Sequence, residues 1–319
     1  MLLGTWNLEN LYRPGGEFGP SDKASYEAKL VSLAATISAL EPGLLGIQEV
    51  GDPEALDDLT SLLSGTWHTA LSEHADGRGI RVGFLSRHPL DVRSDTNFLA
   101  PLLRPVQSDD DGDPAPTMGR GALVVQIRPE QGPELHVAVC HLKSKLLSYP
   151  GKRFAPRDED ERARYGAYAL FRRAAEATTV RALADGLIDG KGKQRAVVVL
   201  GDMNDEAGAA TTQILHGPPG SEIGTTGFER EDNGDHWRLW NIAPLIPGDR
   251  RYSRIHSGHK ELIDHILISH RLLKDVESAG TGTIGAADPP PLPSVAESPT
   301  ERRDARGSDH APVWVRLRT

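Results

Sequence analysis

Residues 197–205, VVVLGDMND, place an aspartate, an asparagine and a second aspartate directly behind a run of valine and leucine. A run this short and β-branched is typical of a strand that is buried on both faces. Because side chains alternate along a strand, Asp202 and Asn204 are expected to leave its end on the same side. Two interpretations are open at this point. The residues form an Asp/Asn turn, or they serve a site at the end of a sheet, where open α/β sheets place their chemistry.

The same arrangement recurs along the chain, because other apolar runs also carry polar groups at or near their ends. These groups are Asn7, Glu49, His141, Lys143, Asp264, His265, Asp309 and His310. A charge at the edge of a buried strand is costly unless it is paired or coordinates a metal. One such residue is often a satisfied structural group, whereas several at strand ends indicate one shared site.

The elements that must position these groups are predicted from hydrophobic periodicity and from helix and turn signals. Besides the run at 197–202, strands are expected at 2–7, 44–50, 80–86, 121–127, 135–142, 262–269 and 311–317. Helices are expected at 21–40, 53–63, 159–187 and 207–215. Strands alternate with helices in places and pair without them in others, which indicates mixed sheets covered by helices.

Two segments are predicted to be loop excursions. Residues 104–116 are acidic and typical of a solvated loop, and a calcium loop at this place would lack its closing glutamate. Residues 279–307 are rich in Gly, Pro, Ser and Ala, so we expect a long excursion before the last strand.

The composition is that of an ordinary globular protein, with 319 residues, 38% hydrophobic and 25% charged. The net charge of −9 argues against a generally basic nucleic-acid binder, although a metal can supply positive charge locally. The single cysteine, Cys140, excludes an internal disulfide and fits a reducing compartment. We see no signal peptide and no apolar membrane span, so a cytoplasmic location is expected, with a trimmed secreted chain as the alternative.

Taken in order, six segments resemble the endonuclease/exonuclease/phosphatase superfamily, which includes deoxyribonucleases, abasic-site endonucleases, sphingomyelinases and inositol-phosphate phosphatases. They are TWNLEN, GIQEV, HLKSK, VVLGDMND, LIDHIL and SDHAPV, and they extend from residue 4 to about residue 315. The resemblance implies an α/β fold, a four-layer α/β/β/α sandwich of two mixed β-sheets flanked by helices. It also implies a single domain over residues 1–319, because one site would draw on both Asn7 and His310.

The resemblance further implies a site for Mg²⁺ or Mn²⁺, cations that prefer oxygen ligands. Glu49 resembles the principal metal ligand of the family, with Asn7 and Asp309 close by. The alternatives are a strand-end carboxylate at a helix N-terminus for Glu49 and a turn former for Asn7. Whether one ion or two is bound is left open.

The catalytic roles also follow from the resemblance. Asp202 and Asn204 resemble the pair that positions the attacking water and holds a phosphate oxygen. His310 resembles the invariant histidine, either a general base or a cation on the phosphate, and Asp264 would hold its other ring nitrogen. His141 resembles the second catalytic histidine of the deoxyribonuclease and sphingomyelinase branches, which weighs against abasic-site specificity; a structural role for His141 stays open.

Two cations, Arg120 and Lys143, are candidates for the lining of the phosphate site, or they are solvated strand-end cations. The basic segments 151–183 and 250–260 suit a nucleic-acid backbone, although 151–183 also reads as a solvated helix with interleaved acidic residues.

We therefore predict a divalent-metal-dependent phosphodiester hydrolase, a nuclease that cleaves DNA or RNA, with no membrane and no obligate protein partner. The alternative is a phosphatase or phosphodiesterase that acts on an inositol phosphate, a nucleotide or a phospholipid head group. A non-catalytic module on the same fold predicts broken motifs, and none is visibly broken.

Overall fold

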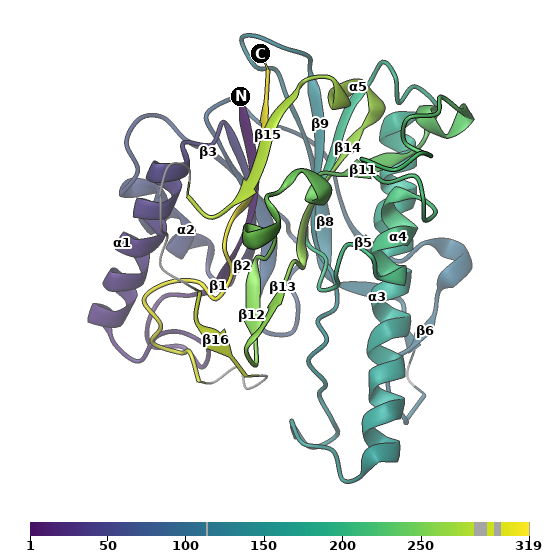
Figure 1. Ribbon diagram of the computed structural model, residues 1–319. Helices are drawn as coiled ribbons and strands as arrows, with labels where there is room; N and C mark the ends of the chain where they lie inside the picture. The colour runs from purple at the N-terminus through teal and green to yellow at the C-terminus, as the bar shows by residue number, and fades with distance from the viewer. Residues whose placement is uncertain (113, 284–291, 297–300, 319) are drawn as a thin grey trace.

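The computed structural model describes residues 1–112, 114–283, 292–296 and 301–318, and its main body is two six-stranded mixed sheets with helices outside them (Figure 1). The first sheet contains β1 (Leu2–Leu11), β2 (Leu44–Val50), β3 (His68–Leu71), β4 (Arg81–Ser86), β15 (Val276–Thr281) and β17 (Val313–Leu317). The second sheet contains β5 (Asp91–Phe98), β8 (Thr117–Ile127), β9 (Leu135–His141), β10 (Ala196–Asp202), β11 (Leu239–Asn241) and β14 (Asp264–Ser269).

Their orders are β15-β17-β1-β2-β4-β3 and β11-β14-β10-β9-β8-β5. The pairs β1–β2 and β9–β10 are parallel, and the other neighbours in both sheets are antiparallel. Two smaller sheets complete the strands: β12 (Arg254–His256) with β13 (His259–Glu261) and β16 (Ser294–Val295), and β6 (Val106–Gln107) with β7 (Pro114–Ala115).

The α-helices are α1 (Lys23–Leu40), α2 (Pro53–Ser61), α3 (Glu159–Ile188), α4 (Ala210–His216) and α5 (His270–Leu273). Short 3₁₀ turns lie at Pro101–Leu103, Asn233–His236, Ala243–Leu245 and Gly248–Arg250. The two long helices have side-chain N-caps, because Asp22 accepts the N–H of Ser25 and Asp158 accepts the N–H of Glu161. No helix in the described part of the chain is long and apolar enough to cross a membrane.

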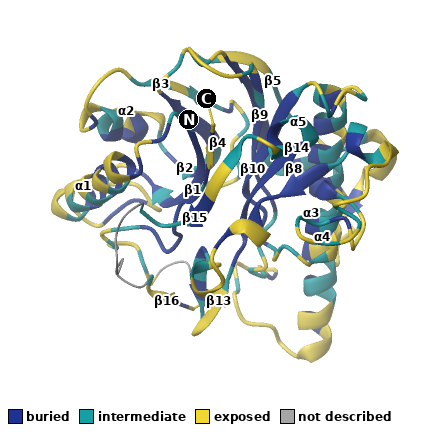
Figure 2. Cartoon of the chain, turned by 45° about the horizontal axis from the view of Figure 1, so that its top comes forward, coloured by how far each residue is buried: buried dark blue, intermediate teal, exposed yellow. Residues whose placement is uncertain are grey.

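The run at 197–200 shows how the layers are built. Val198 and Leu200 belong to the core between the two sheets, while Val197 and Val199 pack with residues of α3 behind the second sheet. A third core joins α1 and α2 to the outer face of the first sheet. The central strands of both sheets are accordingly buried, and the helices keep an exposed outer side (Figure 2). The four-layer α/β/β/α sandwich expected from the sequence is confirmed.

The two sheets pack tightly at Gly46 of β2. A Cβ atom at this position would lie 2.1 Å from Cδ1 of Leu200, on the facing sheet, so only glycine fits without rearrangement. This contact connects the two sheets directly beneath the edge at which the polar groups gather.

That edge is set by strand direction and register. Asp202 pairs across the sheet with His141 on parallel β9 and with Asp264 on antiparallel β14. On the other sheet Asn7 pairs with Gln48, and His310 lies just before β17, bridged to Arg254 of β12. The ends of strands that are far apart in the sequence therefore meet at one edge of the sandwich.

Most expected strands and helices are present, with boundaries shifted by a few residues, but several strands that were not predicted are also there. They are β3, β5, β6, β7, β11, β12, β13, β15 and β16. Most are short or polar, and they are ordered by pairing with a distant partner rather than by a local hydrophobic pattern.

The two expected excursions are only partly loops. In 104–116, β6 and β7 form a small hairpin, and Asp110 pairs with Arg164 of α3. In 279–307, Ala279–Thr281 complete β15 and pair with β17, and β16 pairs with β12. Residues 113, 284–291 and 297–300 lie outside the described residues.

Candidate active site

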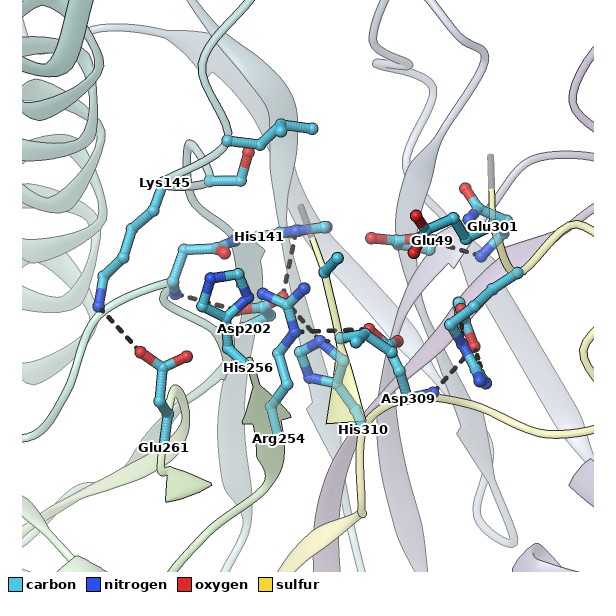
Figure 3. A pocket seen from close by; sticks show the side chains of 18 of the residues that line it. Glu49, His141, Lys145, Asp202, Arg254, His256, Glu261, Glu301, Asp309 and His310 are labelled. Atoms are coloured by element: carbon cyan, nitrogen blue, oxygen red, sulfur yellow. Dashed lines mark hydrogen bonds and ion pairs between the residues drawn. The ribbon is translucent and has the colours of Figure 1, made fainter. Parts of the chain in front are cut away.

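The edge described above carries a cavity of about 300 Å³ between the two sheets and the small β12-β13-β16 sheet. Of the predicted site residues, seven line it (Figure 3): Glu49, Arg120, His141, Asp202, Asn204, Asp309 and His310. Asn7 and Asp264 lie directly behind this lining and are bonded to it.

Asp202, at the end of β10, connects the groups in the cavity. Its Oδ1 accepts the backbone N–H of Asn204 at 2.9 Å, and its Oδ2 accepts the side-chain N–H of Asn7 at 3.0 Å. The same Oδ2 lies 3.3 Å from Nε2 of His141 and 4.0 Å from Nε2 of His310. Burial, and then the neighbouring charge of Asp264, raise the pKa of Asp202 to about 7.

His310 and Asp264 form a buried pair. Nδ1 of His310 lies 2.7 Å from Oδ2 of Asp264, which holds the ring and leaves Nε2 facing Asp202 and Asp309 at 4.0 Å each. Burial alone would lower the pKa of His310, but the surrounding carboxylates outweigh it and raise this pKa to about 10. The metal-free site therefore holds an imidazolium at neutral pH.

His141, at the end of β9, is in the opposite state. It is buried, and burial together with the charge of Arg120 lowers its pKa well below the ordinary value. Its ring is thus neutral, with Nε2 toward Asp202. Its Nδ1 is buried and has no hydrogen-bond partner within the described ranges. One edge of the cavity therefore offers a neutral histidine and another a charged one.

Glu49 and Asn7 come from the two parallel strands of the first sheet. The side-chain N–H of Asn7 donates to Oε1 of Glu49 at 3.1 Å, and the backbone N–H of Asn10 donates to Oε2 at 2.9 Å. The Oδ1 of Asn7 accepts the N–H of Glu9 at 2.9 Å. Asn7 thus uses its nitrogen to hold Glu49 and Asp202 in place.

Asp309 is held by a network that includes a residue the sequence reasoning missed. Oε2 of Glu9 accepts the N–H of Asp309 at 2.8 Å, and both oxygens of Glu9 bind the guanidinium of Arg302. The buried amine of Lys29, from α1, donates to the carbonyl of Glu9 at 2.6 Å. On the other side, Nε of Arg254 lies 3.4 Å from Oδ2 of Asp309.

Comparison with known proteins shows which family the chain belongs to. The profile of the Endonuclease/Exonuclease/phosphatase family matches residues 4–310, which is nearly the whole chain. The protein belongs to this family. No protein with a curated description matches the sequence.

Solved structures of the family share the fold over the full length of the chain. Truncated TDP2 from Caenorhabditis elegans has 14% identity and a TM-score of 0.55, over 100% of this chain and 97% of that one. The human Nocturnin catalytic domain has 17% identity and a TM-score of 0.55, over 99% of this chain and 93% of that one. A mannosyl-6-phosphatase of Bacteroides thetaiotaomicron has 18% identity and a TM-score of 0.55, over 100% of both chains. At these identities the likeness shows the fold alone.

Membership of the endonuclease/exonuclease/phosphatase family makes this protein a phosphoesterase, a hydrolase with a buried Asp/Asp/His cluster. The ligand atoms of Asp202, Asp264 and His310 lie within 4.8 Å of one another and can hold a metal ion. Oδ1 of Asp264 is buried without a hydrogen-bond partner among the described residues. Glu49 and Asp309 add further carboxylate oxygens to the lining, so the donor set fits a hard divalent cation such as Mg²⁺.

Of the two predicted phosphate cations, the structure brings only one into the cavity. Arg120 lines it, although its Nε lies 3.2 Å from Oδ2 of Asp76. Lys143 does not line it, because its amine donates to the carbonyls of Ser144 and Leu146 in the loop that follows β9. Lys145, two residues on, lines the cavity instead.

Other charged residues of the lining that the sequence reasoning missed lie in loops, near the end of β1 or at the start of β12. They are Glu9, Arg78, Lys145, Arg254 and Arg302. Glu9 and Lys145 lie within the TWNLEN and HLKSK segments, and Arg254 lies within the basic segment 250–260, but none of the three was singled out as a site residue. His265, by contrast, faces away from the cavity, with Nε2 2.9 Å from the carbonyl of Asp205.

Proposed function

We propose that the protein is a divalent-metal-dependent phosphoester hydrolase in which a water molecule attacks phosphorus in line with the leaving oxygen. One observation supports this most strongly: Asp202 lies between a neutral His141 and a charged His310 in a cavity rimmed by carboxylates and arginines. A general base, a proton donor and charge stabilisation are thus available within one small volume.

The residues that would hold the ion are Glu49 and Asp309, with Asp202 beside them. Nδ1 of His310 lies 2.7 Å from Asp264, and its Nε2 faces Asp202 and Asp309 at 4.0 Å each, which leaves the ion to the oxygen donors. When bound, a divalent ion offsets charge on the phosphate and helps to orient it. Asn7 is assigned to positioning, since its nitrogen bonds both Glu49 and Asp202.

The remaining roles follow from protonation and hydrogen bonding. Asp202, with a pKa near neutrality, can orient the water and accept its proton. The imidazolium of His310 can donate from Nε2 to a phosphate oxygen, which favours the cation among its two expected roles. Asn204 donates its side-chain N–H to the carbonyl of Leu142 at 3.0 Å, which fixes its amide at the cavity wall. His141 can hydrogen-bond the phosphate or the leaving oxygen.

For the substrate we infer a phosphodiester of nucleic acid, as the sequence predicted. The cationic residues on the cavity lining support it, namely Arg78, Arg120, Lys145, Arg254 and Arg302. A broad duplex-binding face is not supported, because arginines of α3 are engaged by carboxylates, such as Arg164 by Asp110 and Arg172 by Glu176. Because these arginines are already paired, a second candidate substrate is a small phosphoester, which needs no extended cationic face.

The test is nicking of supercoiled plasmid and cleavage of a short single strand by the purified protein with Mg²⁺ or Mn²⁺. EDTA and Asp309→Asn should each abolish cleavage, while Asp95→Asn, on β5 of the second sheet, should leave it intact. Metal-dependent hydrolysis of nucleotides or sugar phosphates without any cleavage of nucleic acid would support the second candidate. No hydrolysis of either class by the folded, metal-loaded protein would contradict the proposal.

A further inference from the structure

A groove of about 320 Å³ adjoins the active-site cavity, between the loop that follows β9 and the N-terminal half of α3. Lys145 lines both the groove and the cavity, so the two lie on either side of this residue. Figure 1 shows the loop descending beside α3 before it turns into the helix. The residues that matter are Lys145, Tyr149, Phe154, Arg162, Gly166 and Arg173.

One face of α3 forms the floor. Arg162, Gly166, Ala169 and Arg173 line the groove and are spaced by four, three and four residues, which places them on a single helix face. A Cβ atom on Gly166 would meet nothing within 4 Å, so the middle of the floor is open space. A glycine inside a helix costs about 1 kcal/mol relative to alanine.

The opposite wall is held in place by the loop itself. The N–H of Tyr149 donates to the carbonyl of Arg153 at 2.9 Å, and the ring of Tyr149 lies 5.0 Å from that of Tyr165 on α3. The guanidinium of Arg153 binds both oxygens of Glu161, at 2.7 and 3.2 Å. The groove is thus preformed, which lowers the ordering cost of binding.

The chemistry of the walls suits a planar base flanked by phosphates. Phe154 is 52% exposed, a large apolar ring left at the surface of the groove. The amine of Lys145 lies 3.4 Å from Asp205 and 3.7 Å from Glu261 and is half exposed. Arg162 pairs with the exposed Glu159, and such surface pairs contribute about 0–1 kcal/mol. Lys145 and Arg162 can therefore leave their carboxylate partners and bind a phosphate at a small cost in free energy.

We propose that this groove binds the nucleotide next to the reactive phosphodiester of a single-stranded nucleic acid. The base stacks on Phe154 over the open floor at Gly166, and Lys145 and Arg162 contact the flanking phosphates. The inference rests on the proposed function, since it takes the cavity as the place of phosphodiester hydrolysis. A single strand suits the groove because its bases are free to stack on Phe154, whereas a duplex would present no free base face.

The experiment measures binding of 5′-fluorescein octathymidylate by anisotropy, in EDTA so that no cleavage is required. The variants are Phe154→Ala, which removes the stacking ring, and Gly166→Leu, which fills the floor. The matched controls are Phe171→Ala and Gly186→Leu: both residues are on α3 outside the groove, Phe171 is 49% exposed, and a Cβ on Gly186 also meets nothing within 4 Å. A second probe is an abasic octamer with the same backbone.

We expect Phe154→Ala and Gly166→Leu to weaken octathymidylate binding about tenfold, as loss of one stacked base should, with both controls unchanged. The abasic octamer should bind the wild type more weakly and be insensitive to Phe154→Ala. Wild-type affinity in Gly166→Leu, an equal loss in the controls, an equal effect of Phe154→Ala on both probes, or no octathymidylate binding would each overturn the inference. Failure of the proposed function is seen separately, as absence of metal-dependent hydrolysis of bis(4-nitrophenyl) phosphate.

Discussion

At the residue scale, the cavity is built on backbone that is rarely adopted. Glu9, Asn10, Glu49 and Asn204 have φ values of 50°, 55°, 62° and 53°, in the left-handed region. Asparagine tolerates this region, whereas glutamate does so at a cost of about 1–3 kcal/mol. All four line the cavity. Strain gathered at one place is typical of a functional site, because the surrounding structure must maintain it.

Asp202→Asn should separate activity from stability. Removal of the general base should lower kcat/KM by about 10²–10⁴-fold. Because burial raises the pKa of Asp202 to about 7, its charge is unfavourable in the metal-free fold, so the neutral amide should increase the free energy of unfolding at pH 8 by about 1–3 kcal/mol. Kinetics and urea unfolding in EDTA provide the check. A variant that keeps wild-type kcat/KM would contradict the role assigned to Asp202.

The stability of the metal-free protein should fall as the pH rises. The folded-state pKa of His310 is raised from 6.5 to about 10, so its protonation stabilises the fold fully below pH 6.5. That stabilisation is lost as the pH passes through about 10. We expect the free energy of unfolding in EDTA to decline over this window, and to decline much less in His310→Gln. Equal pH dependence in the two proteins would show that His310 is not the titrating group.

At the element scale, the two sheets must approach closely enough for β1 and β2 to meet β9, β10 and β14 at one edge. Gly46 permits this approach, since any Cβ there would collide with Leu200. The polar groups of the two sheets then come within hydrogen-bonding distance, as the bond from Asn7 to Asp202 shows. The spacing of the layers therefore sets the geometry of the site.

Gly46→Ala should destabilise the fold by about 1–3 kcal/mol through overpacking and should weaken activity as the sheets move apart. Leu200→Ala removes the side chain in conflict, so the double variant should lose less than the sum of the two single losses. Gly77→Ala serves as the control, because a Cβ there meets nothing within 4 Å. Urea unfolding of the four proteins measures the coupling, and simple additivity would contradict the proposed contact.

At the scale of the whole molecule, the site draws on residues from the two ends of the sequence. The salt bridge between Glu9 and Arg302 joins positions 293 residues apart. The single-domain organisation and the cytoplasmic location stay predictions. The concentration of carboxylates at the cavity, however, has a consequence for the entire fold, because their mutual repulsion is relieved when a cation binds.

Mg²⁺ or Mn²⁺ should therefore raise the melting temperature, by an amount that corresponds to about 2.7 kcal/mol at a concentration of one hundred times Kd. The shift should be lost in Asp309→Asn and retained in Asp95→Asn, and an equal ionic strength of NaCl should not reproduce it. Differential scanning calorimetry makes the comparison. Equal shifts in all three proteins would place the ion elsewhere.

Local patterns in the sequence predicted mixed sheets covered by helices, and the family resemblance implied the four layers and the site residues. Buried strands are visible as short apolar runs, and the period of two in a strand predicts that Asp202 and Asn204 emerge together. The motifs at Glu49, His141, Asp264 and His310 have the order of the family. These features can be predicted from the sequence because each depends on a few neighbouring residues.

Which charges face the cavity depends on the packed fold. Lys143 stands two places after His141, as the alternation would require, but β9 ends at His141 and the loop turns the lysine amine toward its own carbonyls. Lys145 takes its place, and Arg302 is brought to Glu9 by the return of the chain before β17. Alternation holds only within a strand, and pairing between distant segments depends on the packed fold.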